Sequence, residues 1–245
     1  MQNSSSKDQK ILEVVYGAHP LIELIKAGRR KINCVYTTKP YPKAWQRIAG
    51  FLQDKRIEVR VVDKNTLDKI AGCTDHMGVV ALASPFIFKK EIFTPERHPQ
   101  ILLLDSIQDV KNLGAILRSA YCSGFSGVVL SRKGCAPITA ATLKSSAGLA
   151  HHLDVYLASS LEHALIDMKK QGYNVLMAVP NAGIDVREAT IKKPLCLVIG
   201  NEEKGIKKQL FDKGCLITLP QINQDVSYNA SVAAGILMFY LSYCK

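Results

Sequence analysis

The sequence predicts an α/β protein of two domains, and three observations support this. Apolar runs rich in β-branched residues alternate with helical patterns almost from end to end, as in α/β units built around parallel sheets. The chain has 245 residues, of which 47% are hydrophobic and 22% charged, so it can bury a core and is not disordered. Residues 86–99 lose periodicity and place prolines among charges, which is typical of a linker.

The first domain is expected at residues 11–85, after a frayed tail at residues 1–10 that lacks the apolar centre of a secretory signal. Prolines in His19-Pro20 and Tyr41-Pro42 stand at or near first helical turns, where the missing N–H costs nothing. The predicted strands are Ile32–Thr38, Ile57–Asp63 and Gly78–Ser84, and the predicted helices are His19–Arg30, Pro42–Arg56 and Asn65–Gly72.

The second domain is expected at residues 100–245 and continues the same alternation. Its predicted strands are Ile101–Asp105, Gly127–Ser131, Asn174–Val179, Pro194–Ile199 and Cys215–Leu219. Its predicted helices are Leu113–Ser123, Ala140–Leu149, Leu161–Gln171, Lys204–Lys213 and Asn229–Tyr243. No charge occurs from Val226 to Cys244, but serines and an asparagine interrupt this run, leaving it short of the ~20 apolar residues of a membrane span. A buried C-terminal helix is the better interpretation.

The net charge indicates a polyanionic partner. Lys and Arg total 32 against 21 Asp and Glu, a formal charge of +11. Residues 1–100 hold 17 cations and 10 acids, a net +7, and residues 101–245 hold 15 and 11, a net +4. This surplus favours nucleic acid or an anionic membrane, although an ordinary basic enzyme remains open.

Several kinds of site are not indicated. The seven cysteines form no CxxC or Cys/His cluster and are odd in number, so we expect a reduced, cytoplasmic protein without a metal. No GxGxxG follows a strand, which argues against a dinucleotide site. Gly200 and Gly205 span a GxxxxG, but Ile206-Lys207 follows where a phosphate-binding loop needs Lys and then Ser or Thr.

Three segments carry more polar residues than a scaffold needs. In Asp105–Arg118, a strand end leads into an apolar helix that Asn112 would cap, and Gly114 allows close approach of a partner or ligand. Arg118 lies six residues on, about 240° around the helix from Asn112. This arginine is either a snorkelling surface charge or a functional group.

The other two segments follow later strands. In Leu197–Ile206 a buried strand runs into a turn with two glycines and two carboxylates, where α/β proteins place ligands, although Glu202 there could simply cap the next helix. In Leu219–Gly235, Ser227, Asn229 and Ser231 precede small residues and could likewise cap a helix.

In this order the segments resemble the three motifs of the SpoU (TrmH-like) branch of the SPOUT methyltransferases. The family pattern N-x-G-x-x-x-R is met by Asn112, Gly114 and Arg118. G-x-E-x-x-G is met by Gly200, Glu202 and Gly205, and P followed by S-x-N-x-S by Pro220, Ser227, Asn229 and Ser231. Tyr228 departs from the usual leucine, and Glu203 from a common glycine.

The first domain adds to the resemblance. VYGAHPLIELIKAG and HMGVVA resemble the opening and closing of the small RNA-binding domain that precedes the knot in the bacterial 23S ribosomal RNA guanosine-2'-O-methyltransferase type. The resemblance implies a parallel α/β domain with a deep trefoil knot, dimerisation through that domain, and S-adenosylmethionine as methyl donor.

The implied cofactor-binding residues are Gly200, Leu219, Tyr228, Glu202, Ser227 and Asn229. The implied catalytic residues are Arg118 and Asn112. Arg118 would stabilise the developing alkoxide or a neighbouring phosphate, with proton acceptance left open because guanidinium is a poor base.

The resemblance implies methylation of a ribose 2'-hydroxyl in structured RNA, with a guanosine of 23S ribosomal RNA as the favoured target. A transfer RNA methyltransferase of the same family is the main alternative, and a resistance-type enzyme acting at another ribosomal RNA site is a further one. A non-catalytic RNA-binding protein with a degenerate knot is the alternative from another class, which the intact motif residues disfavour.

Overall fold

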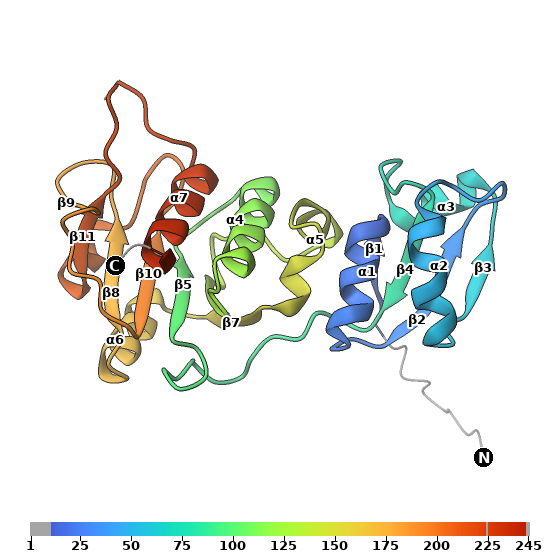
Figure 1. Ribbon diagram of the computed structural model, residues 1–245, viewed down its shortest axis with the longest axis horizontal. Helices are drawn as coiled ribbons and strands as arrows, with labels where there is room; N and C mark the ends of the chain where they lie inside the picture. The colour runs from blue at the N-terminus through green and yellow to red at the C-terminus, as the bar shows by residue number, and fades with distance from the viewer. Residues whose placement is uncertain (1–10, 224, 244–245) are drawn as a thin grey trace, which may run out of the picture. The chain divides into compact units, whose positions relative to one another are not determined.

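The computed structural model describes residues 11–223 and 225–243, and the chain divides into one unit ending at Ile87 and another beginning at Phe88 (Figure 1). The predicted tail at residues 1–10 lies outside the described residues. Among those described, no helix is long and apolar enough to cross a membrane.

The first unit is built on a four-stranded mixed sheet. Its order is β1-β4-β2-β3, in which β4 runs antiparallel to β1 and β2, while β2 and β3 are parallel. The expectation of a parallel sheet is therefore wrong for this unit, because the central β4 follows a short turn and runs against both neighbours. The strands are β1 (Glu13–Tyr16), β2 (Ile32–Thr37), β3 (Val59–Val61) and β4 (Val79–Ala83).

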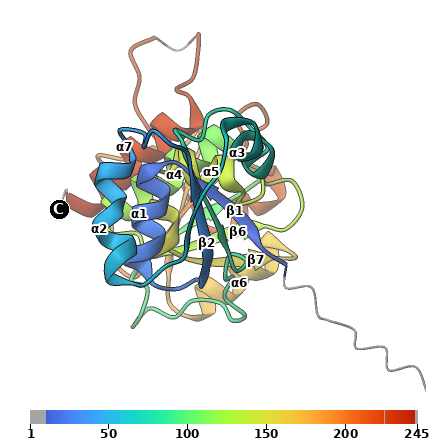
Figure 2. The ribbon, with the colours of Figure 1, turned by 90° about the vertical axis from the view of Figure 1, so that its right-hand side faces the viewer.

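Three helices pack on this sheet: α1 (Ala18–Ala27), α2 (Trp45–Asp54) and α3 (Lys64–Ala71). In Figure 2, α1 and α2 lie together on one side of the strands and α3 lies on the other. The α3 helix begins where Asp63 accepts a hydrogen bond from the Thr66 N–H at 2.9 Å, and it ends at Gly72 in the left-handed conformation.

The closing H-x-G of this unit has a structural role. His76 is buried; its Nε2 lies 2.6 Å from Asp68 Oδ1 on α3, and its Nδ1 accepts a hydrogen bond from the Gly78 N–H at 3.0 Å. Gly78 has φ 78°, and a Cβ there would lie 2.7 Å from Pro42. Glycine at this position therefore lets the loop after β2 pack against the turn before β4.

The second unit is built on a seven-stranded parallel sheet of order β7-β6-β5-β10-β8-β11-β9. This confirms the predicted fold class for the second domain. The sequence did not predict β7 and β9, both at sheet edges. The strands are β5 (Gln100–Leu104), β6 (Gly127–Ser131), β7 (Asp154–Ala158), β8 (Asn174–Ala178), β9 (Ile184–Asp185), β10 (Leu195–Ile199) and β11 (Cys215–Thr218).

Helices cover both faces of this sheet, as the continuous burial of β5, β6 and β10 requires. One face packs on α6 (Leu161–Lys170) and the 3₁₀ segment Lys208–Lys213 through alternate strand residues such as Ile101 and Val198. On the other face, α4 (Val110–Cys122) packs against both α5 (Ala140–Ser145) and α7 (Ala230–Tyr243).

Two predicted helices of the second unit are clearly shorter than expected, and in the first unit the helix predicted for residues 42–56 spans only Trp45–Asp54. The helix predicted for residues 140–149 ends at Ser145, because Ala147 and Gly148 adopt positive φ angles of 53° and 83°. The helix predicted for residues 204–213 is only a 3₁₀ segment from Lys208, because Gly205 has φ 65° and closes the preceding turn.

The segment between the last strand of the first unit and β5 packs on the second unit from residue 88 onward. The Lys89 N–H donates to the Val155 carbonyl at 2.7 Å, and Phe93 is buried in the core beneath β6. Tyr173 Oη donates to the His98 carbonyl at 2.7 Å. Residues 88–98 therefore have fixed positions on the second unit.

Candidate functional site

The carboxyl ends of β8, β10 and β11 meet at one pocket. Loops after these strands and the first turns of α7 line it, next to the point where the strand order reverses between β5 and β10. In parallel sheets this is the place where ligands bind. The lining residues are Ala178, Val179, Pro180, Ile199, Gly200, Asn201, Glu202, Glu203, Gly205, Leu219, Gln221, Ser227, Tyr228, Ala230, Ala233 and Leu237.

The turn after β10 is closed on itself. The main-chain N–H and C=O groups of Asn201 and Gly205 exchange hydrogen bonds of 3.1 and 3.0 Å, and Asn201 Oδ1 accepts from the N–H groups of Glu203 and Lys204. A Cβ on Gly200 would lie 2.2 Å from the carbonyl carbon of Gly205. Because those neighbouring atoms are backbone, only glycine fits at residue 200.

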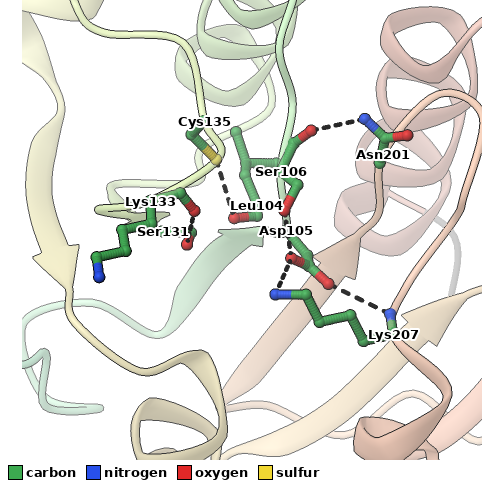
Figure 3. Close-up of polar contacts among 8 residues, drawn as sticks. All are labelled: Leu104, Asp105, Ser106, Ser131, Lys133, Cys135, Asn201 and Lys207. Atoms are coloured by element: carbon green, nitrogen blue, oxygen red, sulfur yellow. Dashed lines mark hydrogen bonds and ion pairs between the residues drawn. The ribbon is translucent and has the colours of Figure 1, made fainter.

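A buried carboxylate ties this turn to β5 (Figure 3). Asp105 is 1% exposed; its Oδ2 accepts from the Lys207 N–H at 3.3 Å, and its Oδ1 lies 3.5 Å from Lys207 Nζ. Ser106 Oγ donates to Asp105 Oδ1 at 2.9 Å, and Asn201 Nδ2 donates to the Ser106 carbonyl at 2.8 Å. These contacts fix the turn relative to the segment that leads into α4.

The loop after β6 closes against the same strand end. Cys135 Sγ lies 3.4 Å from the Leu104 carbonyl, and Ser131 Oγ donates to the Lys133 carbonyl at 2.5 Å (Figure 3). Burial raises the pKa of the Cys135 thiol, which disfavours its reactive thiolate form.

The Asn112 side chain joins two other motif residues through hydrogen bonds behind the pocket wall. Its Nδ2 donates to Glu202 Oε1 at 3.0 Å, and its Oδ1 accepts from Asn229 Nδ2 at 3.1 Å. Asn201 Nδ2 contacts the other Glu202 oxygen at 3.2 Å. One residue from each of the three sequence motifs thus belongs to a single hydrogen-bonded chain.

Two capping assignments from the sequence need correction. Asp109, and not Asn112, caps α4, since its Oδ1 accepts from the Lys111 N–H at 2.8 Å. Glu202 caps no helix and instead accepts hydrogen bonds from Asn112 and Asn201. Asn229 does cap α7, because its Oδ1 accepts from both the N–H and the hydroxyl of Ser231, at 2.8 and 2.6 Å.

Gly114 serves helix packing rather than ligand approach. A Cβ there would lie 2.4 Å from the Ser145 Cβ of α5 and 2.8 Å from the Thr142 carbonyl. Ser145 Oγ also donates to the Lys111 carbonyl at 3.0 Å. The glycine of the first motif therefore allows α4 and α5 to pack closely.

The structure brings most of the predicted site residues together but not Arg118. Gly200, Glu202, Leu219, Ser227 and Tyr228 line the pocket, and Asn112 and Asn229 reach its wall through Glu202. Arg118 is exposed on α4, outside the pocket lining, and within the described part of the chain no hydrogen bond or ion pair engages it. This agrees with its place about 240° around the helix from Asn112.

Sequence reasoning missed the part of the pocket that follows β8. Ala178, Val179 and Pro180 line it there, and the only signal was a strand end followed by proline and glycine. The same reasoning missed Gln221, whose Nε2 donates to the Val226 carbonyl at 3.1 Å and so shapes the loop that carries Ser227. In the described ranges no cluster of His, Cys, Asp or Glu could hold a metal ion.

The outer face of α7 is apolar and open. Val232, Ile236, Phe239 and Tyr243 are 48%, 40%, 60% and 64% exposed, and they recur every three or four residues along one side of the helix. The Phe239 and Tyr243 rings lie 5.1 Å apart, centroid to centroid. We call these four side chains the α7 stripe.

Comparisons with known proteins agree with this arrangement. A family model described as the SpoU rRNA methylase family matches residues 99–239. A second model, described as RNA 2'-O ribose methyltransferase substrate binding, matches residues 14–88. A Staphylococcus haemolyticus protein placed in the TrmH family of tRNA/rRNA methyltransferases is 30% identical over 236 residues, covering 92% of this chain and 93% of that protein.

Solved structures share the fold. A crystal structure of an RNA 2'-O ribose methyltransferase is similar with a TM-score of 0.81 and 22% identity, covering 98% of this chain and 91% of that one. An AdoMet-bound rRNA methyltransferase from Sinorhizobium meliloti is similar with a TM-score of 0.73 and 21% identity, covering 96% and 88%. At these identities the likeness establishes the fold.

Proposed function

The chain belongs to the SpoU rRNA methylase family and is an S-adenosylmethionine-dependent RNA 2'-O-ribose methyltransferase, and we propose that its target is a guanosine of 23S ribosomal RNA. The convergence of three separate motif segments at one pocket supports the activity, because Asn112, Glu202 and Asn229 form one hydrogen-bonded chain behind it. The match of residues 14–88 to a substrate-binding model supports the proposed RNA target. The second unit accordingly has the knotted SPOUT fold of its family.

The pocket suits a donor that is held largely through backbone groups. At Gly200 two stretches of main chain approach too closely for a side chain, and the closed turn from Asn201 to Gly205 lines the cavity. Gly200, Leu219 and Tyr228 would hold the donor, while Glu202, Ser227 and Asn229 would orient the loops around it. When bound, S-adenosylmethionine supplies an electrophilic methyl group.

The residues of the chain then have to align a ribose hydroxyl and assist the loss of its proton. Alignment of two reactants in near-attack geometry is worth about 7–11 kcal/mol of the barrier. Arg118 is the proposed cation for the developing alkoxide or an adjacent phosphate. A guanidinium is a hydrogen-bond donor with a delocalised positive charge and a poor base, so Arg118 would act as a cation, and its acceptance of the proton stays open.

We further propose that the active form is a homodimer assembled through the second unit. The α7 stripe is an open apolar surface on a helix that packs against α4, the helix that carries Arg118. Arg118 lines no part of the pocket of its own chain, and in the proposed dimer this cation would act at the reacting ribose of the partner copy. The dimer also covers apolar side chains that water would otherwise contact.

Ribosomal RNA is favoured over transfer RNA by the leading unit. Residues 14–88 match a substrate-binding model of RNA 2'-O ribose methyltransferases, and residues 1–87 hold 14 Lys and Arg against 8 Asp and Glu, a net +6. A basic domain ahead of the catalytic one suits a large folded RNA. The described cysteines are free, which fits a protein of the cytoplasm, where these RNAs are found.

Mapping of 2'-O-methyl groups tests the target directly. Ribosomal and transfer RNA from cells with and without the protein are compared for methylation-dependent reverse-transcription stops. A guanosine stop in 23S RNA that disappears with the protein and returns with purified enzyme and S-adenosylmethionine is the expected result. A stop that changes only in transfer RNA would replace the proposed target with the alternative one.

A further inference from the structure

We propose that Tyr41 and Trp45 form a stacking platform for an unpaired nucleobase of the RNA, with Lys39, Lys43 and Arg47 as contacts for the flanking phosphates. The proposal rests on the proposed function, because it takes RNA as the substrate. It assigns a specific surface to the first unit, at the loop between β2 and the start of α2. We call these five residues the platform.

The geometry of the two rings suits a nucleobase. The Tyr41 and Trp45 rings are nearly parallel, with an interplanar angle of 8° and centroids 5.1 Å apart. Tyr41 is 51% exposed, so this stacked pair lies at the surface rather than in the core. Base–aromatic stacking needs an accessible, flat ring system of this kind, and it tolerates any base because each base has a π face.

The charge around the rings has one sign. Residues 24–53 hold seven Lys and Arg and no Asp or Glu. Lys39 Nζ lies 5.7 Å from the centroid of the Tyr41 ring, and Lys39, Lys43 and Arg47 are exposed. Over the described ranges, neither Lys43 nor Arg47 forms an ion pair, so both charges are available to a polyanion.

The platform is held in place before any RNA arrives. Pro42 packs on Gly78, and the buried Thr37 donates from Oγ1 to the Gly78 carbonyl at 2.9 Å, which fixes the two ends of the loop to the turn before β4. The Trp45 N–H donates to the Pro42 carbonyl at 2.8 Å as α2 begins. The Arg47 N–H likewise donates to the Ala44 carbonyl at 3.2 Å, so the first turn of α2 is held by main-chain hydrogen bonds.

The chemistry favours an unpaired stretch of RNA over a duplex or a protein. In a duplex the base faces are stacked on one another, and proteins read A-form RNA mainly through phosphates and 2'-hydroxyls. A duplex would therefore use the three cations but leave both rings without a partner. A protein partner would not require a thirty-residue stretch without an acidic side chain.

Trp45 is the only tryptophan of the chain, which gives the platform its own signal. We would titrate the full-length protein with a single-stranded 12-nucleotide oligouridylate and with a 12-base-pair RNA duplex, following intrinsic fluorescence and the anisotropy of labelled RNA. We expect the single strand to quench Trp45 while it binds, and the duplex to bind with little quenching. Binding without quenching by the single strand, or no binding of it at low salt, would overturn the proposal.

Variants separate stacking from charge. Tyr41→Ala and Trp45→Leu should each weaken single-strand binding about tenfold, and Trp45→Phe should restore most of it. Phe51→Leu is the matched aromatic control, because Phe51 is exposed on α2 but lies about 240° around the helix from Trp45. Lys43→Gln should lower the slope of binding against salt, and the exposed Lys69→Gln on α3 should not.

Methyl transfer distinguishes failure of this proposal from failure of the proposed function. With ribosomal RNA as substrate, Tyr41→Ala should raise KM for RNA and leave kcat and S-adenosylmethionine binding unchanged. Normal KM in an active Tyr41→Ala enzyme would reject the platform and keep the methyltransferase. Quenching of Trp45 in a wild-type protein that methylates no ribosomal RNA would reject the proposed target and keep the platform.

Discussion

The side chain of Asn229 donates a hydrogen bond to Asn112 Oδ1 at 3.1 Å across 117 positions of the sequence. This bond links the first residue before α7 to the first turn of α4, and Asn112 continues the chain to Glu202. Asn229 also caps α7 through the Ser231 N–H. One asparagine therefore holds a helix end with its oxygen and the pocket wall with its nitrogen.

The two roles of Asn229 can be separated by substitution. Asn229→Asp keeps the acceptor that caps α7 but removes the donor to Asn112, whereas Asn229→Ala removes both. We expect the Asp variant to keep the wild-type melting temperature and lose about tenfold in methyl transfer, as one hydrogen bond of the chain is lost. The Ala variant should lose the same activity and also about 1 kcal/mol of stability. Equal activity of the Asp variant and wild type would show that the bond does not position the site.

The sequence predicted the central strands and the edge strand β3, and it missed the other three edge strands. The undetected strands β1, β7 and β9 all lie at the edges of their sheets; β1 and β7 are only partly buried, and β9 has no buried residue. An edge strand is short and packs on one neighbour, so its apolar pattern is weak. By contrast, β5, β6 and β10 are buried at every position, and their apolar runs were plain.

The sequence predicted which three segments form the candidate site, but not which of their side chains contact one another. Asp109 and Asn112 are both capping residue types, and their spacing alone does not tell which of them caps α4. Asn112 does not cap the helix because its side-chain amide instead donates a hydrogen bond to Glu202, ninety positions away. The sequence predicted Asp105 only as the end of a strand. Its contacts with Lys207 could not be predicted, because the fold brings that residue beside it from a distant part of the chain.

Gly200→Ala should disrupt the pocket. An added Cβ at residue 200 would meet main-chain atoms of Gly205 and Ile206 at 2.2–2.6 Å, so the turn itself must move. We expect calorimetry to show loss of S-adenosylmethionine binding, with a loss of about 1–3 kcal/mol in unfolding free energy from overpacking. Gly50→Ala is the control: nothing lies within 4 Å of its Cβ, and alanine in the middle of α2 should stabilise by about 0.5–1 kcal/mol. Normal donor binding by Gly200→Ala would place the donor elsewhere.

Arg118→Ala should abolish methyl transfer and leave donor binding nearly intact. Arg118 lines no part of the pocket in its own chain, so its removal does not alter the walls that would hold the donor. The measurements are single-turnover methyl transfer and calorimetry with S-adenosylmethionine. Lys170→Ala, which removes a comparably exposed cation from α6, is the matched control. Retained turnover in the Arg118 variant would remove this residue from the mechanism.

Charge placed on the α7 stripe should separate the subunits. Phe239→Glu puts a carboxylate at a 60% exposed position, where it is harmless in a monomer but unfavourable inside an apolar interface. Sedimentation should show a dimer for wild type and a monomer for the variant, and the monomer should lose methyl transfer if Arg118 acts across the interface. Ile184→Glu, at a 50% exposed position on β9, should leave both properties unchanged. A wild-type monomer with full activity would contradict the dimer proposal.

Removal of the first unit tests whether that unit binds RNA while the second unit binds the methyl donor. The cut belongs at Phe88, because Lys89 and Phe93 pack on the second unit and a protein beginning after residue 97 would expose its core. A chain of residues 88–245 should still bind S-adenosylmethionine, since every pocket residue lies within it. It should bind structured ribosomal RNA more weakly and with a shallower dependence on salt, because it loses phosphate contacts from the more basic part of the chain. Anisotropy titrations at several salt concentrations would measure both effects, with a chain beginning at residue 98 as a comparison.

If residues 88–245 bind RNA with the affinity and salt slope of the full chain, the RNA surface lies on the methyltransferase unit and the assignment of the first unit is wrong.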